Sequence, residues 1–170
     1  TNGEGQAFFF RDEARGEAPY NGFLDAAALV ASAPGGAPDA LFDFGPLPSS
    51  AVTTKGIGWR TPRREIDWVW DHATARWLRF HRGAPLLDET GVQLAADNVL
   101  VLYVDYRMSD ADLESPQSIT TGSGDGWLLR DGTITGVTWS RPFIADRWSL
   151  ADDDTGDRVN LRTGRTWVAL

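Results

Sequence analysis

Few side chains in this sequence are suited to acid–base or metal chemistry. It contains two histidines, His72 and His81, and neither has an Asp or Glu at metal-ligand spacing on a helix. Cysteine is absent, which excludes a thiolate nucleophile, a thiolate metal site and a disulfide framework. No Gly-x-Ser-x-Gly elbow occurs, so nothing supports a serine hydrolase. We therefore expect no catalytic histidine, no metal site and no cofactor.

Aspartates could still provide catalysis, because a pair of carboxylates can act as acid and base without histidine. The candidates are Asp67, Asp71, Asp88 and Asp125. A catalytic pair requires two side chains about 5–9 Å apart in one cleft, one of them desolvated. Carboxylates scattered over the tips of turns would instead indicate a non-catalytic module.

Two further segments have compositions that occur in ligand sites. The glycines of 122–126 allow close approach of a ligand or a positive φ. A phosphate-binding loop precedes a helix, however, and this segment precedes an expected strand, so we expect a tight turn or bulge, with ligand contact as the alternative. The run 152–157 holds four carboxylates without the EF-hand order or its terminal glutamate. A hairpin turn is expected there, with a calcium site as the alternative.

If the protein has a ligand-binding surface, we expect it to combine a strand–helix junction with the glycine segment. The expected contact residues are Arg11, Arg15, Asn21, Asn98, Gly122, Ser123, Gly124 and Asp125. The alternative is that the two arginines pair with nearby acids and that Asn21 shapes a turn.

Eight tryptophans are many for 170 residues, and exposed ones can stack on the faces of sugars. Trp68, Trp139 and Trp167 lie in expected strands, however, where packing in a core accounts for them. A sugar-binding platform remains the alternative.

Length and charge restrict the class of protein. A chain of 170 residues corresponds to roughly one domain at about 150 residues per domain. Its net charge of −8 disfavours binding to nucleic acid or to anionic lipid. No apolar run approaches the roughly 18 residues of a membrane span.

The pattern of apolar residues predicts strands and turns with a single helix. The aromatic run in 6–12 predicts a buried strand, and Asp25 can cap a helix over 25–33. Residues 41–44 are expected to form a short strand. Ile66, Trp68 and Trp70 alternate with polar residues, which predicts a hairpin with 76–82. In this hairpin Trp68 should pack on Leu78 or Phe80.

Further strands follow towards the C-terminus. Residues 99–106 are apolar on both faces and predict a central strand. Two more hairpins are expected over 127–139, with Asp131-Gly132 as the turn, and over 148–161, and 166–168 should form a last strand. We expect an α+β fold, mainly an antiparallel β-sheet with hairpins and one helix near the N-terminus. Residues 1–38 should form the tail of a preceding domain, and 39–170 a mainly β C-terminal domain.

An ordered set of short motifs resembles the YerB-like bacterial lipoprotein family, the domain of unknown function 3048. The motifs are Phe10-Arg11-Asp12 with Arg15, Ala18-Pro19-Tyr20-Asn21, Trp68-Val69-Trp70-Asp71, Trp77-Leu78-Arg79-Phe80, Gly83-Ala84-Pro85, Asp88-Glu89-Thr90-Gly91, Asn98-Val99-Leu100-Val101, Gly122-Ser123-Gly124, Arg130-Asp131-Gly132, Trp139-Ser140-Arg141 and Gly164-Arg165-Thr166-Trp167-Val168. They cover the end of the family's first part and the whole of its C-terminal part. Two histidines frequent in the family are absent, with Tyr20 and Leu86 at those positions.

The resemblance implies an exported, often lipid-anchored protein of unassigned biochemical function, located outside the cytoplasm. The first hypothesis is a non-catalytic binding or scaffolding module of the bacterial cell envelope, membrane-bound only through a lipid anchor of the full-length protein. The alternative is an enzyme that acts on an envelope glycan or peptide with an Asp pair. We further expect the chain to be a fragment. Its first strand should lie against the preceding domain, a second copy or the local sheet.

Overall fold

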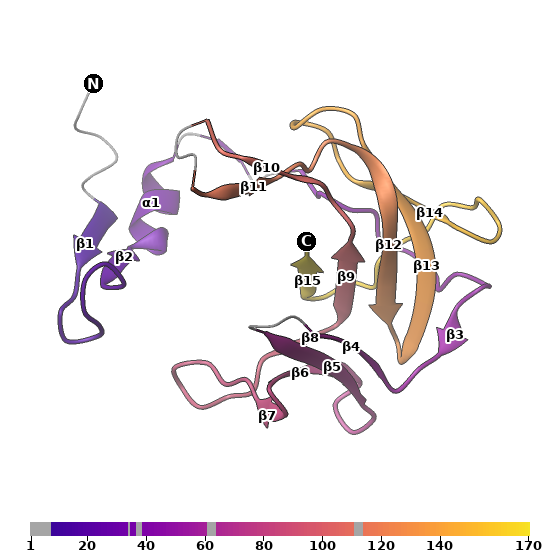
Figure 1. Cartoon of the computed structure of the whole chain (residues 1–170), viewed down its shortest axis with the longest axis horizontal. Coiled ribbons are helices and arrows are strands. Elements are labelled where there is room, and N and C mark those ends of the chain that lie inside the picture. The colour runs from indigo at the N-terminus through magenta and orange to yellow at the C-terminus, as the bar shows by residue number, and fades with distance from the viewer. Residues whose placement is uncertain (1–7, 34, 37–38, 61–63, 111–113) are drawn as a thin grey trace. The chain divides into compact units, whose positions relative to one another are not determined.

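The computed structural model describes residues 8–33, 35–36, 39–60, 64–110 and 114–170. These residues form two compact units, Thr1–Asp39 and Ala40–Leu170. The described residues contain one α-helix and many strands, nearly all of them antiparallel (Figure 1). The prediction of a mainly antiparallel β fold with one helix near the N-terminus is confirmed.

The first unit consists of a two-stranded sheet followed by the helix. Strands β1 (Phe9–Arg11) and β2 (Gly22–Leu24) pair antiparallel, with Phe10 opposite Phe23. Helix α1 (Ala26–Ser32) begins after Asp25, whose carboxylate accepts the Ala28 N–H at 2.9 Å. This cap satisfies one of the free amides of the first turn, as the sequence predicts. Of the strand predicted over 6–12, residues 6–7 lie outside the described part.

The first unit has no apolar core of its own. Asn21 is its one buried residue among those described. Phe9 is 61% exposed, Phe10 48% and Val30 74%. The prediction that the first strand is buried is therefore wrong within this unit, because a two-stranded sheet and a two-turn helix have too little surface to cover these side chains.

The described residues of the second unit form two large sheets and one two-stranded sheet, and the largest has six strands. Its members are β3 (Val52–Thr53), β9 (Asn98–Leu102), β12 (Gly122–Arg130), β13 (Thr133–Arg141), β14 (Ser149–Asp152) and β15 (Thr166–Ala169). The order is β14-β13-β12-β9-β15, and β3 pairs with one end of β13. Strand β15 runs parallel to β9, and the other pairs are antiparallel.

The hairpin of β12 and β13 turns at Asp131-Gly132, as predicted. Both residues have positive φ, +50° and +73°. Two such residues in sequence make the type of turn whose twist matches that of the flanking strands.

The second sheet has five strands, and its register differs from the prediction. It contains β4 (Gly56–Arg60), β5 (Glu65–Asp71), β6 (Arg76–His81), β7 (Ala84–Pro85) and β8 (Ala95–Ala96). The turn over 72–75 sets Trp68 opposite Arg79. Since neighbouring residues of a strand point to opposite faces, Leu78 and Phe80 lie on the other face, and the expected packing of Trp68 on them is wrong.

The six-stranded sheet has an apolar core on each face. Val99 of β9 and Leu129 of β12 face the five-stranded sheet, where they pack with Trp68 and Trp77. Leu100 and its neighbours face a second cluster formed with the segments around residues 42 and 148–161. Burial on both faces explains why β9 is apolar from Val99 to Leu102.

Three predicted strands are shorter than expected. In 41–44 only Phe44 forms a bridge, with Leu161, and the return arm of the 148–161 hairpin is a single bridge from Arg158 to Ala151. Strand β9 ends at Leu102, and β10 (Tyr106–Met108) pairs separately with β11 (Pro116–Ser118).

Among the described residues, no helix has the length and apolar character needed to cross a membrane.

Candidate functional site

The glycine segment is the beginning of strand β12. Its five residues pair in continuous register with β13, from Gly122 opposite Arg141 to Gly126 opposite Val137. The expected tight turn or bulge is therefore wrong. A Cβ at Gly124 would lie 2.9 Å from both the indole nitrogen of Trp139 and the carbonyl oxygen of Tyr103. This glycine is required because the Trp139 side chain packs directly on the backbone.

A cavity of about 260 Å³ lies beside this strand. We call it the β12 pocket, and its walls are Tyr103, Val104, Asp105, Ile119, Thr121, Ser123, Gly124, Asp125 and Trp139. The Trp139 indole N–H donates to the Tyr103 carbonyl at 3.1 Å, and this bond holds two of the walls together. Three of the predicted ligand residues, Ser123, Gly124 and Asp125, thus share one pocket.

The β12 pocket presents hydroxyls, carboxylates and one aromatic ring to solvent. Asp105 and Asp125 are exposed, and neither forms an ion pair with a described residue. The Tyr103 side chain is 60% exposed. Carboxylates accept hydrogen bonds, side-chain hydroxyls donate and accept them, and an exposed ring offers a flat apolar face. This combination suits a neutral or cationic ligand rich in hydroxyl groups.

Asn98, another predicted ligand residue, is completely buried. Its amide nitrogen donates to the Arg162 carbonyl at 2.7 Å and to the Thr166 hydroxyl at 3.1 Å, and its oxygen accepts the Arg162 N–H at 2.8 Å. These bonds attach the segment before β15 to the start of β9. Asn98 therefore has no exposed atom for a ligand, and its role is structural.

Gly122, at the start of β12, is not among the residues that line the β12 pocket. The strand–helix junction contains the last three predicted residues. Arg11 donates to the side-chain oxygen of Asn21, and the Arg15 guanidinium lies 4.3 Å from the centre of the Phe23 ring. The Asn21 carbonyl also accepts the Asp12 N–H at 3.0 Å, so Asn21 shapes the turn. The junction belongs to the first unit and the β12 pocket to the second, so each is a surface of its own.

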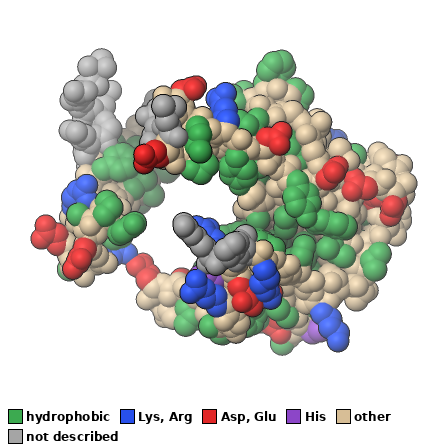
Figure 2. All heavy atoms as spheres, in the orientation of Figure 1, with side chains coloured by type: hydrophobic (Ala, Val, Ile, Leu, Met, Phe, Trp, Pro, Cys, Tyr) green, Lys and Arg blue, Asp and Glu red, His purple; other side chains and the backbone are tan. Residues whose placement is uncertain are grey.

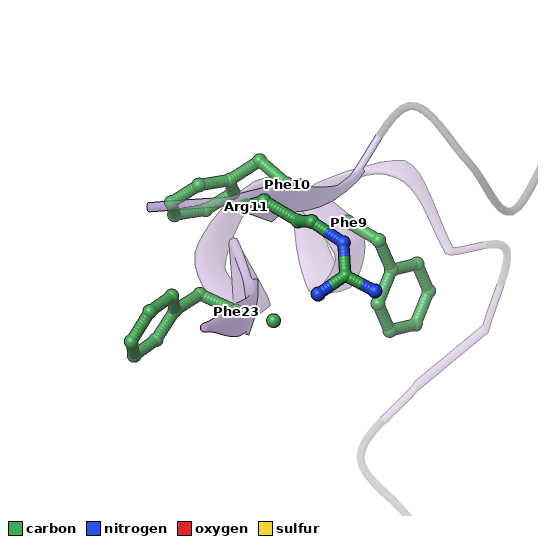
Figure 3. A pocket seen from close by; sticks show the side chains of 5 residues that line it. Phe9, Phe10, Arg11 and Phe23 are labelled. Atoms are coloured by element: carbon green, nitrogen blue, oxygen red, sulfur yellow. The ribbon is translucent and has the colours of Figure 1, made fainter. Parts of the chain in front are cut away.

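The junction forms a shallow, largely aromatic cavity of about 440 Å³. Its walls are Phe9, Phe10, Arg11, Gly22 and Phe23, and Figure 3 shows the Arg11 side chain between Phe9 and Phe23. Because the Phe9 and Phe10 rings are exposed, this surface is better suited to contact with another protein surface than to enclosure of a small molecule.

Two of the candidate catalytic carboxylates stabilise turns. Asp71 accepts the Thr74 N–H at 3.0 Å and its hydroxyl at 2.5 Å. Asp88 accepts the N–H groups of Thr90 and Val92 at 2.9 and 3.0 Å and the Thr90 hydroxyl at 2.6 Å. In each case the threonine hydroxyl is the main cause of a lowered pKa. A general acid requires the opposite shift.

The remaining candidates are also outside any desolvated pair. Asp67 forms an ion pair with Arg60 at 2.9 Å. His72 accepts the Trp70 indole N–H at 3.2 Å in the turn after β5, and His81 is exposed at the end of β6. Figure 2 shows acidic side chains at several separate places on the face drawn.

The aspartate run 152–157 forms the predicted turn. Asp152 is 4% exposed, and its carboxylate accepts the N–H groups of Asp154 and Thr155 at 2.9 and 3.2 Å and the Ser50 hydroxyl. The Ser50 hydroxyl is the main cause of its lowered pKa. The Gly156 N–H closes the turn on the Asp152 carbonyl at 2.8 Å.

A comparison with known protein families matches a family model to the second unit. The family model described as the C-terminal domain of a protein of unknown function (DUF3048) matches residues 57–168. The chain belongs to the DUF3048 family. The β12 pocket lies within the matched residues, and the resemblance found in the sequence motifs is confirmed.

A solved structure has the same fold as this DUF3048 chain. The crystal structure of YerB from Bacillus subtilis matches with a TM-score of 0.69 at 18% sequence identity, over 95% of this chain and 56% of that one. The chain thus spans little more than half of the YerB chain. No curated protein matches it.

Six of the nine residues that line the β12 pocket were not predicted as ligand residues. Tyr103, Val104 and Asp105 follow β9 and are brought to the glycine segment by the pairing of β9 with β12, whereas Thr121 directly precedes that segment in the chain. The available signal was the appearance of Asp105 within the apolar run 99–106, after β9 has ended at Leu102.

Proposed function

We propose that this DUF3048 chain is a non-catalytic binding or scaffolding module of an exported bacterial envelope protein, which is lipid-anchored in its full-length form. The observation that supports a non-catalytic role is that three of the candidate carboxylates already have partners within the chain. The carboxylates of Asp71 and Asp88 accept hydrogen bonds within their own turns, and Asp67 forms an ion pair with Arg60. The location outside the cytoplasm rests on the family resemblance.

The ligand surface in this proposal is the β12 pocket, and the ligand is a cell-wall glycan. The hydroxyls of Thr121 and Ser123 and the carboxylates of Asp105 and Asp125 suit the hydroxyl groups of a saccharide. The exposed ring of Tyr103 can stack on a sugar face. A net charge of −8 favours glycans without excess negative charge.

Titration with soluble oligosaccharides of N-acetylglucosamine, which carry no charge, tests the proposal. Saturable amide shifts in an NMR spectrum should map to the residues of the β12 pocket. Asp125→Ala should weaken binding by about ten-fold, since a hydrogen bond to a charged group contributes roughly 1.5–3 kcal/mol. Asp154→Ala, which removes an exposed carboxylate in the 152–157 turn, is the matched control. Shifts that do not saturate, or that are unchanged in Asp125→Ala, would refute binding of the glycan in the β12 pocket.

An enzyme remains the second candidate because Asp105 and Asp125 line the same pocket. Both are exposed, and neither acid is desolvated as a proton donor requires. In this alternative a bound glycan would have to bury one of them on binding. Cleavage products that disappear in both Asp105→Asn and Asp125→Asn would support it.

The partner of the first unit is, in this proposal, the preceding domain of the same protein or a second copy. The support is the exposed aromatic surface of Phe9 and Phe10, beside the half-buried Phe23, which β1, β2 and α1 leave uncovered. Amide hydrogen exchange in residues 8–11 should be much slower in a longer chain that contains the preceding domain. Light scattering distinguishes the second copy by a doubled mass. Equal exchange in a monomeric longer chain would contradict both partners.

A further inference from the structure

Arg79 is an arginine with no hydrogen-bond or ion-pair partner for its side chain among the described residues. It is partly buried on β6, and its Nε atom is buried without an acceptor. Other arginines have side-chain partners: Arg11 with Asn21, Arg60 with Glu65 and Asp67, Arg76 with Asp97, Arg130 and Arg162 with Asp131, and Arg147 and Arg158 with Asp43. In a chain with 24 acidic residues, the missing partner of Arg79 requires an explanation.

Two tryptophans hold the Arg79 guanidinium in place. Its central carbon lies 4.3 Å from the ring centre of Trp167 and 5.4 Å from that of Trp68. The two rings come from different sheets, since Trp68 is on β5 and Trp167 on β15. Stacking uses the flat faces of a guanidinium and leaves the N–H groups in its plane available. The group is therefore fixed in orientation without using its donors.

The surroundings of Arg79 favour the approach of an anion. Burial is the main cause of its lowered pKa, and the positive charge of Arg64 is the second. Both effects oppose the charged form, and a nearby negative charge would relieve both. An arginine remains protonated under these conditions, so the site keeps an uncompensated positive charge.

A cavity of about 340 Å³ lies next to this arrangement. Its walls are Leu94, Ala95, Ala96, Arg165, Thr166 and Trp167. Two of them contact Arg79: the Leu94 carbonyl accepts the Arg79 N–H at 2.9 Å, and the Trp167 ring stacks on the guanidinium. Four of the six walls are apolar or aromatic and one is a second arginine, Arg165, so the cavity beside the fixed guanidinium suits a small organic anion with an apolar part.

We propose that Arg79, held between Trp68 and Trp167, binds an oxyanion group of a small organic ligand whose apolar part occupies the adjacent cavity. A carboxylate or a phosphate accepts two parallel N–H bonds from the guanidinium, and either group fits this geometry. The site is separate from the β12 pocket and does not depend on a glycan binding there.

The test is an NMR titration of the intact chain, which observes the Nε–Hε group of Arg79 directly. The two probes are benzoate and phenyl phosphate, which share an apolar ring and differ in the anion, at constant ionic strength with chloride as the control. We expect a saturable shift of this signal and quenching of tryptophan fluorescence with at least one probe. The probe that binds more tightly identifies the anion.

Variants establish whether Arg79 is responsible. Arg79→Met keeps much of the apolar stem and should abolish saturable binding. Arg79→Lys keeps the charge without the planar fork and should weaken binding by about ten-fold. Arg147→Gln removes an exposed arginine that lies 3.8 Å from Asp43 and should leave binding unchanged.

Two results would overturn the proposal. One is a linear response of the Arg79 signal to both probes, equal to that with chloride. The other is saturable binding that persists in folded Arg79→Met. Circular dichroism and thermal unfolding establish that each variant is folded, and the titration of the unmodified chain decides the question even if a variant is not.

Discussion

At the scale of single residues, buried polar side chains of this domain hold irregular segments against the six-stranded sheet. The Asp152 carboxylate accepts hydrogen bonds from two amides of its own turn and from the distant Ser50 hydroxyl. The Asn98 side chain forms hydrogen bonds with both the N–H and the carbonyl of Arg162. From the sequence alone, such polar residues resemble ligand-binding residues. Their burial shows that their partners belong to the chain itself.

Asp152→Ala should lower the free energy of unfolding by about 1–3 kcal/mol at neutral pH, because it leaves buried donors without an acceptor. The pKa of Asp152 is lowered in the folded state, so this stabilisation is present above the unfolded value of about 3.9. It is lost as the pH falls through the folded pKa. Urea unfolding at neutral and acidic pH measures it, with Asp154→Ala as control. A difference that does not decrease in acid would contradict this assignment.

Asn98→Ala should be more costly, about 2–4 kcal/mol, because the N–H and carbonyl of Arg162 are both left unpaired. The loss should appear as faster hydrogen exchange in β15, whose start Asn98 holds. Gln117→Ala, at an exposed amide on β11, should change stability little. Unchanged exchange in β15 would show that its parallel pairing with β9 does not depend on Asn98.

At the scale of elements, the hairpin of β12 and β13 combines local turn chemistry with long-range packing. The turn was predictable because Asp-Gly satisfies a local requirement for positive φ. The register of β5 and β6, by contrast, depends on the conformation of the 72–75 turn, which alternation of apolar residues does not specify. Helix α1 was predictable from its cap, whereas the exposure of its apolar side chains depends on what lies outside the helix.

Gly132→Ala should destabilise the second unit by about 1–2 kcal/mol from positive φ alone, with an added cost from crowding. A Cβ at Gly132 would lie 2.9 Å from the Trp70 indole nitrogen. Gly91→Ala has the same kind of backbone cost, at a φ of +83°, with no atom within 4 Å of the new Cβ. Thermal unfolding of both variants should rank Gly132→Ala as the less stable. Equal losses would mean that Trp70 moves aside without cost.

At the scale of the whole molecule, stability is concentrated in the second unit. The apolar clusters on the two faces of the six-stranded sheet are built entirely from its residues, whereas the first unit buries only Asn21 among its described residues. The sequence predicted the β-rich class, since it depends on local alternation. It did not predict the β12 pocket as a whole, because the pocket requires the pairing of strands distant in the chain.

Limited proteolysis should therefore cut within the first unit and leave a resistant fragment that begins near Ala40. Segments with few buried contacts open at low free energy and are cleaved first. Mass spectrometry of the early products gives the cut sites. Early cleavage within β5 (Glu65–Asp71), in the five-stranded sheet, would contradict this distribution of stability.

In this proposal the β12 pocket binds an envelope glycan without changing it. This is tested by the mass of the N-acetylglucosamine oligosaccharides recovered after prolonged incubation with the protein at a concentration that saturates the pocket. We predict recovery of the unchanged ligand, with binding that Asp125→Ala weakens. Products of altered mass, formed by the unmodified chain and not by Asp125→Asn, would contradict the claim and make this protein an enzyme.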